Sequence, residues 1–242
     1  MRPPLKDARL AGTRRRSPAG RVGSSSVIER YALLAATSYV IGSIPFGLYA
    51  ARRSLTAGPT KSSANVAPLS LYRRSASDRT FAGLTFSLEL AKGFVPTLTG
   101  YLALGTVGAV GGGSAALIGH SFPLFTRFQG SNSIAPLLGV LLAVYPIVVV
   151  ILGMVWTAAL AAWRYASLAA LATAVVSPLA LAALDVGGNQ ENLVIGASVL
   201  WSLLVFYAHR ENIRRLLNGR EPKVKATAVY NRGGASHSRR VR

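Results

Sequence analysis

The chain has 242 residues, of which 51% are hydrophobic and only 14% are charged, and it contains no cysteine. A soluble domain usually has about 25% charged residues, so this composition excludes a disordered chain and disfavours an ordinary soluble enzyme. The absence of cysteine excludes disulfides and thiolate chemistry.

The positive charge lies mainly at the two ends of the chain. Of the 27 Lys and Arg, eight fall in residues 1–30 and ten in residues 209–242, and the net charge is +19. A nucleic-acid-binding domain would carry its basic residues on one face of a soluble fold. An apolar body with basic ends indicates a membrane protein, so we expect membrane lipids and no nucleic acid among its partners. The terminal segments 1–30 and 226–242 are rich in Arg, Ser and Gly and are predicted to be disordered.

Seven segments of the body are candidates to cross a bilayer, which takes about 20 helical residues per crossing. The uncharged run from Phe128 to Trp163 is divided in two because Pro146 disfavours helix at the preceding Tyr145. In chain order the predicted spans are 31–51, 80–105, 106–125, 134–144, 146–163, 166–184 and 192–208. The sequence therefore predicts an all-α, polytopic membrane bundle of about seven transmembrane helices within residues 31–225.

The distribution of Lys and Arg in the loops predicts the orientation of the bundle. The loop 52–80 has six basic residues and one acidic residue, and Arg127 and Arg164 lie in two further loops. The loop 185–191 has two acidic residues and no basic residue. We expect the basic loops and the C-terminus to share the cytosolic face of the plasma membrane. Seven spans place the basic N-terminal tail outside. Three explanations stay open: translocation of the tail, a re-entrant hairpin, or a poorly ordered extension.

Polar residues on the predicted cytosolic face form the first candidate site. Residues 61–74 contain Ser63, Asn65 and Arg73. Small polar residues let backbone N–H groups approach an anion, and a guanidinium nearby adds charge. The alternative is a solvated, positively charged loop.

Two more polar segments follow the third and the last predicted spans. In the segment 119–133, His120 is either a proton carrier or hydrogen-bond donor, or a buried histidine satisfied by a neighbouring helix. In the segment 209–216, His209 and Asn212 are three residues apart and share one face of a helix. Taken alone, that helix is a basic juxtamembrane segment that meets anionic lipid.

One charged pair lies inside a predicted span. Glu89 and Lys92 are three residues apart, so they can pair on a helix, either as a structural clamp or as an acid–base pair. The chain lacks the motifs of zinc proteases and nucleotide-binding loops, and we expect no metal and no cofactor.

Five motifs in this order resemble the acyl-phosphate:glycerol-3-phosphate acyltransferases of bacterial membranes, the PlsY family, over residues 39–225. They are Ile-Gly-Ser-Ile-Pro-Phe-Gly at 41–47, Leu-Glu-Leu-Ala-Lys-Gly at 88–93, Gly-His-Ser-Phe-Pro-Leu-Phe at 119–125, Arg-Tyr-Ala-Ser-Leu at 164–168, and the segment 209–223. The resemblance implies a seven-span bundle that transfers an acyl group from acyl-phosphate to the sn-1 hydroxyl of glycerol-3-phosphate. The product is lysophosphatidic acid, the first intermediate of phospholipid synthesis.

Both predicted phosphate loops depart from the family pattern. The first family loop, G-S-G-N-x-G-A-T-N, corresponds to residues 62–70, where all three glycines are replaced. The second, G-G-K-G-V-A-T, corresponds to residues 130–136, where Asn132 replaces the lysine. A glycine-rich turn that approaches phosphate closely is not expected to keep its shape without the glycines.

The resemblance assigns roles to individual residues. We expect His209, Ser63 and Asn212 to carry the reaction, with His209 as a hydrogen-bond donor or proton relay. Glu89 and Lys92 are expected either to support the structure or to lie behind the residues that contact substrate. The substrate phosphates are expected to contact Arg73, Asn65, Asn132, Ser131, Gly130, Arg127 and His120.

Two other functions compete with the acyltransferase. A diverged family member that binds a phosphorylated lipid or a protein partner is favoured by the replaced loop residues. A transporter or flippase-like protein is favoured by the intramembrane charges and disfavoured because no inverted half-repeats are visible.

Overall fold

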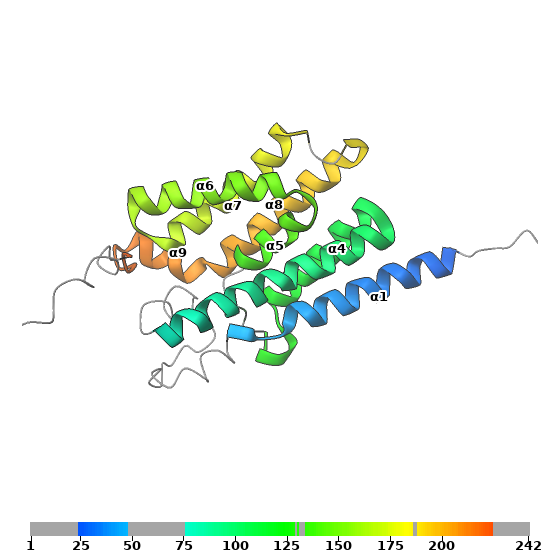
Figure 1. The fold of residues 1–242 in the computed structure, drawn as a ribbon, viewed down its shortest axis with the longest axis horizontal. Helices are drawn as coiled ribbons and strands as arrows, with labels where there is room; N and C mark the ends of the chain where they lie inside the picture. The colour runs from blue at the N-terminus through cyan, green and yellow to red at the C-terminus, as the bar shows by residue number, and fades with distance from the viewer. Residues whose placement is uncertain (1–23, 48–75, 129, 131–133, 186–187, 225–242) are drawn as a thin grey trace, which may run out of the picture.

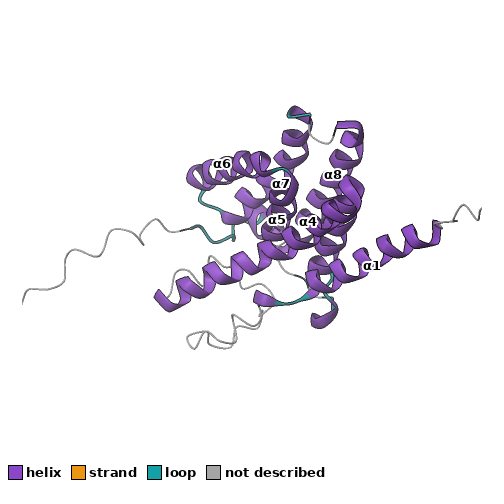
Figure 2. Cartoon of the chain, turned by 45° about the vertical axis from the view of Figure 1, so that its right-hand side comes forward, coloured by secondary structure: helices purple, strands orange, loops and turns teal. Residues whose placement is uncertain are grey.

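The computed structural model describes residues 24–47, 76–128, 130, 134–185 and 188–224, and every regular element in these residues is helical (Figure 2). The elements are α1 Ser24–Ser43, α4 Ala76–Ser121, the 3₁₀ turn η2 Leu124–Thr126, α5 Ile134–Val144, α6 Pro146–Trp163, α7 Ala166–Ala183, the 3₁₀ turn η3 Gly188–Gln190, α8 Glu191–Ala208 and α9 Arg210–Leu217. The predicted all-α class is confirmed.

The long element α4 is a hairpin of two helical arms. Gly105, between the arms, has φ 67° and ψ −156°, a conformation open essentially only to glycine. The arms approach so closely that a Cβ on Gly112 would overlap the carbonyl oxygen of Pro96, and one on Gly100 would overlap that of Gly108. Residues 76–104 and 106–121 therefore run antiparallel and correspond to the predicted second and third spans.

Of the other predicted helix boundaries, some are correct and some are shifted. The uncharged run 128–163 divides into α5 and α6 as predicted, with Pro146 as the first residue of α6. The first helix begins at Ser24 and ends at Ser43, whereas the predicted span was 31–51. Glu29 and Arg30 are exposed and are accommodated near the start of the helix, and Pro45 ends it, because proline disfavours helix at the residue before it. The third predicted span ends at Ser121 for the same reason, ahead of Pro123.

Among the described residues, four helical stretches are long and apolar enough to cross a membrane. They are Gly83–Thr126, which includes both arms of α4, Pro146–Trp163, Ala166–Ala183 and Gly188–Ala208. Their outward faces are apolar: Leu102 is 76% exposed, Leu200 62% and Met154 60%. Such faces suit a lipid environment, where apolar side chains are not driven inward.

The hairpin α4 lies at the centre of the bundle, with α1, α5 and α8 packed against it (Figure 1). Glycines permit the closest approaches: a Cβ on Gly42 of α1 would overlap the carbonyl of Ala116, and one on Gly139 of α5 would overlap that of Leu90. A partly buried hydrogen bond also joins α8 to α4, from Trp201 Nε1 to Ser114 Oγ at 2.9 Å.

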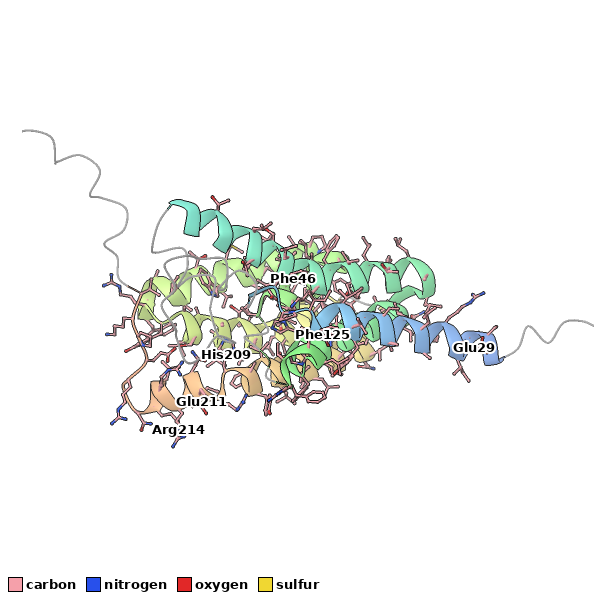
Figure 3. The ribbon with its side chains drawn as sticks, turned by 90° about the horizontal axis from the view of Figure 1, so that it is seen from below. Glu29, Phe46, Phe125, His209, Glu211 and Arg214 are labelled. Atoms are coloured by element: carbon pink, nitrogen blue, oxygen red, sulfur yellow. The ribbon has the colours of Figure 1, made fainter. Side chains whose placement is uncertain are left out.

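The two ends of the chain's described part lie at opposite ends of the bundle. Figure 3 shows Glu29 of α1 at one end of the long axis and His209, Glu211 and Arg214 at the other. The chain therefore traverses the bundle an odd number of times between these points, as the seven predicted spans require.

Candidate functional site

The predicted site residues fall into two groups. His209, Asn212, His120, Gly130, Arg127, Glu89 and Lys92 lie in the described part of the chain. Ser63, Asn65, Arg73, Ser131 and Asn132 lie outside the described residues, so their roles stay predictions.

His209 lies between α8 and α9 and is almost fully buried, with 1% of its surface exposed. Its Nδ1 atom lies 2.9 Å from the carbonyl oxygen of Val205. Because a carbonyl can only accept, Nδ1 carries the proton, and the neutral ring has its lone pair on Nε2. Burial lowers the pKa of His209 below 6.5, against the opposing effects of the Val205 carbonyl and the Glu221 charge. The ring is therefore neutral near pH 7 and can accept a proton.

Asn212, one turn after His209, is hydrogen-bonded to Glu221, a carboxylate that is not among the predicted site residues. Its Nδ2 donates to Glu221 Oε1 at 2.9 Å, and Arg215 Nε donates to Glu221 Oε2 at 2.7 Å. Burial alone would raise the pKa of Glu221, but hydrogen bonds from Asn212 and Arg215, with the charge of Arg215, lower it overall. Glu221 is therefore ionised at neutral pH and fixes the Asn212 amide.

The segment around Glu221 docks on the turn between α6 and α7. The backbone N–H of Val224 donates to the carbonyl of Arg164 at 2.7 Å, and Lys223 Nζ lies 5.5 Å from the centre of the Tyr165 ring. Arg164 adopts a left-handed conformation with φ 62° and ends α6. The motif at 164–168 thus contacts the residues that follow α9, a contact that only the tertiary structure reveals.

The second polar segment lies beside the third. The Tyr39 hydroxyl of α1 donates to the carbonyl of Phe122 at 2.8 Å, and the Phe122 ring lies 5.4 Å from the Tyr207 ring, two residues before His209. Gly130 packs so closely that a Cβ there would overlap the carbonyl oxygen of Ser121. Arg127 remains exposed at the end of η2, with φ 53°.

Glu89 and Lys92 form the ion pair that their spacing predicts, with Lys92 Nζ 2.8 Å from Glu89 Oε2. His120 joins them: its Nδ1 lies 3.2 Å from the same oxygen, and its side chain is 3% exposed. This contact supports the alternative of a buried histidine satisfied by a neighbouring helix. Helical spacing alone does not predict that the two arms of α4 bring these three residues together.

Comparison with known proteins identifies the family of the chain. The profile of the family described as glycerol-3-phosphate acyltransferase matches residues 32–219. A glycerol-3-phosphate acyltransferase of Rhizobium etli is 37% identical over 207 residues, which cover 84% of this chain and 96% of the relative. One of Caulobacter vibrioides is 39% identical, covering 77% of this chain and 84% of the relative.

The chain belongs to the glycerol-3-phosphate acyltransferase family. The solved structure of PlsY (YgiH), an integral membrane glycerol 3-phosphate acyltransferase, has the same fold, with a TM-score of 0.71 at 31% identity. The match covers 81% of this chain and 96% of PlsY, whose structure is known in a glycerol 3-phosphate form and a lysophosphatidic acid form. The recognised family and the membrane bundle are thus both confirmed.

Proposed function

We propose that the protein transfers an acyl group from acyl-phosphate to the sn-1 hydroxyl of glycerol-3-phosphate and releases lysophosphatidic acid and phosphate. The proposal places the site on the cytosolic face of the plasma membrane. Family membership supports acyl transfer to glycerol-3-phosphate. The acyl-phosphate donor and the cytosolic face are the finer parts of the proposal.

The observation that carries the proposal is the state of His209. Its Nδ1–H is committed to the Val205 carbonyl, so the Nε2 lone pair is the basic atom of the ring. A neutral, oriented imidazole suits a general base that removes the proton of an attacking hydroxyl. Asn212, fixed by Glu221, provides an oriented amide one turn away.

The reaction needs no nucleophile from the protein. The sn-1 hydroxyl oxygen attacks the carbonyl carbon of acyl-phosphate, its proton passes to His209 Nε2, and the bond from the carbonyl carbon to the phosphate oxygen breaks. Phosphate is already a good leaving group, so most of the catalysis consists of positioning two anionic substrates and compensating their charge. Ser63 and Arg73 are proposed to orient the phosphates.

Purified protein supplied with acyl-phosphate and glycerol-3-phosphate is expected to form lysophosphatidic acid. His209→Ala is expected to lower kcat by about 10²–10⁴, the usual contribution of general acid–base catalysis. Arg73→Ala is expected to lose most of the rate as well. Wild-type rates in both variants, with normal insertion and purification, would disprove this site.

The proposed orientation is tested in the cysteine-free chain. Single cysteines at Ser70, Gln129 and Asn218 are expected to react with a membrane-impermeant thiol reagent only after the cells are opened. Labelling of any of these positions in intact cells would disprove the proposal that they share the cytosolic face.

The diverged family member remains the second candidate because Asn132 stands where the family has lysine. A hydrogen bond to a charged group contributes about 1.5–3 kcal/mol, so loss of the ammonium weakens phosphate binding by about one to two orders of magnitude. Asn132→Lys, alone or with Ser131→Gly and Ser133→Gly, is expected to lower the KM for glycerol-3-phosphate or to create activity where wild type has none. If the triple variant leaves binding and rate unchanged in a folded protein, the diverged function is favoured.

A further inference from the structure

We propose that Glu89 is a positioning residue for glycerol-3-phosphate: its carboxylate contacts Gly47 and His120, which adjoin the two segments predicted to bind phosphate. The inference rests on the proposed function. Glu89 lies inside a helix and outside both predicted loops, yet it is expected to affect substrate affinity.

Three separate parts of the chain meet at the Glu89 carboxylate. Lys92 Nζ, on the same helical arm, lies 2.8 Å from Oε2. His120 Nδ1, at the end of the other arm of α4, lies 3.2 Å from Oε2. The backbone N–H of Gly47, just beyond α1, donates to Oε1 at 3.3 Å. The side chains of Glu89, Lys92 and His120 are at most 10% exposed.

The contact with Gly47 bears on the first predicted phosphate loop. Gly47 is the last described residue before residues 48–75, which contain Ser63, Asn65 and Arg73. The neighbouring Phe46 ring lies 5.2 Å from Lys92 Nζ, a cation–π distance, so the ion pair fixes two consecutive residues at this point. The exit of the chain from α1 is thereby set relative to α4.

The contact with His120 bears on the second predicted phosphate loop. The carbonyl oxygens of His120 and Ser121 lie directly against Gly130, with no room for a Cβ. Gly130 opens the stretch 130–136 that corresponds to the family's phosphate loop. A shift of the His120 backbone would therefore move the start of this loop.

A pair for stability alone would need only Glu89 and Lys92, which neighbour each other on one helix. The two additional contacts, with Gly47 and His120, come from other segments, and each adjoins one predicted phosphate loop. Because a phosphate is held by several groups at once, a small relative shift of the two loops weakens all of these contacts together.

The test is Glu89→Gln in the full-length protein, with glycerol-3-phosphate affinity measured both as KM and as the Kd of equilibrium binding. The variant keeps the shape of the side chain and removes its charge. Both constants are expected to rise about tenfold, the effect of losing one charge-assisted contact, and kcat is expected to change much less. Glu89→Asp keeps the carboxylate and is expected to keep an affinity close to that of wild type.

Trp201→Phe serves as the matched control for a general loss of stability. It removes the partly buried hydrogen bond to Ser114 in a different part of the bundle. It is expected to lower the unfolding temperature without a change in KM or Kd. Equal increases of KM in Glu89→Gln and Trp201→Phe, or unchanged affinity in Glu89→Gln, would overturn the proposal.

Gly47 provides a second test if Glu89→Gln does not fold. Gly47→Pro removes the N–H that donates to Glu89 Oε1. Gly47→Ala keeps the N–H, and its Cβ would lie 4.0 Å from Glu89 Oε1, an ordinary contact. Weaker binding in Gly47→Pro but not in Gly47→Ala supports the proposal, and identical affinities refute it.

The two measurements separate this inference from the proposed function. Wild type that binds glycerol-3-phosphate but transfers no acyl group contradicts the proposed reaction, while the Kd values still decide the role of Glu89. Wild type that binds no glycerol-3-phosphate contradicts both.

Discussion

Two carboxylates of this protein, Glu89 in the bundle and Glu221 at its end, each contact at least two polar partners. Glu89 is paired with Lys92 and His120, whose side chains are 2% and 3% exposed. Glu221 is paired with Asn212 and with Arg215, whose side chain is 45% exposed. The first cluster is enclosed by helices, and the second has one partner in contact with solvent.

This difference determines what the loss of each carboxylate costs. Removal of Glu89 leaves an ammonium group inside the bundle, where an unpaired charge is expensive. Removal of Glu221 leaves a guanidinium that water can solvate, and an exposed ion pair contributes little by itself. The buried cluster is therefore expected to support the bundle, and the outer cluster to fix the local geometry around His209 and Asn212.

The largest effect is expected for Glu89→Leu. The variant leaves Lys92 without its partner and is expected to lower the free energy of unfolding by about 3–5 kcal/mol, measured by denaturant titration in detergent. The double variant Glu89→Leu/Lys92→Leu is expected to recover most of this loss, since an apolar pair of similar volume often replaces a buried ion pair without cost. A double variant as unstable as the single one would show that charge burial is not the cause.

A smaller and local effect is expected for Glu221→Gln. Its contacts with Asn212 and Arg215 are weakened, and we expect a loss of about 1–2 kcal/mol in the stability of the docked segment. The readout is hydrogen exchange at the Val224 amide, which donates to Arg164, and its protection is expected to fall about tenfold. Glu211→Gln, at an exposed acid of α9, is the control and is expected to leave the exchange unchanged.

The same segment is expected to respond to acid. The pKa of Glu221 is lowered below 4.5 in the folded protein, so its ionised form contributes stability that is fully present above pH 4.5. That contribution is lost as the pH falls through the lowered pKa. Protection of the Val224 amide is therefore expected to persist down to about pH 4.5 and to decline below it. A decline that begins near neutral pH would contradict the assignment.

The smallest effect concerns the pH dependence of catalysis. Because burial lowers the pKa of His209 below 6.5, its neutral form persists into mildly acidic solution. The acid limb of kcat/KM is expected to have its midpoint below pH 6.5. Since the charge of Glu221 opposes the shift, Glu221→Gln is expected to move that midpoint to lower pH. A midpoint above 6.5 in the wild type would exclude His209 as the general base.

The sequence alone determined the class, the family and most of the helices. Within a single long uncharged segment, a helix satisfies all backbone N–H and C=O groups inside the bilayer. The long uncharged runs were therefore sufficient to predict the fold class. Pro146 divided α5 from α6 at the right residue because a proline restricts its own neighbours, a local effect. The first predicted span was displaced from the observed helix because it was started after the last charged residue. The observed helix includes Glu29 and Arg30, which are exposed on its surface.

Only the tertiary structure decided which polar residues meet. The pair Glu89–Lys92 follows from helical spacing, but His120 reaches it because Gly105 reverses the chain between the arms of α4. Glu221 contacts Asn212 because the segment after α9 folds back onto the turn at Arg164. Such contacts depend on the packing of segments far apart in the chain, and neither periodicity nor spacing within one helix contains that information.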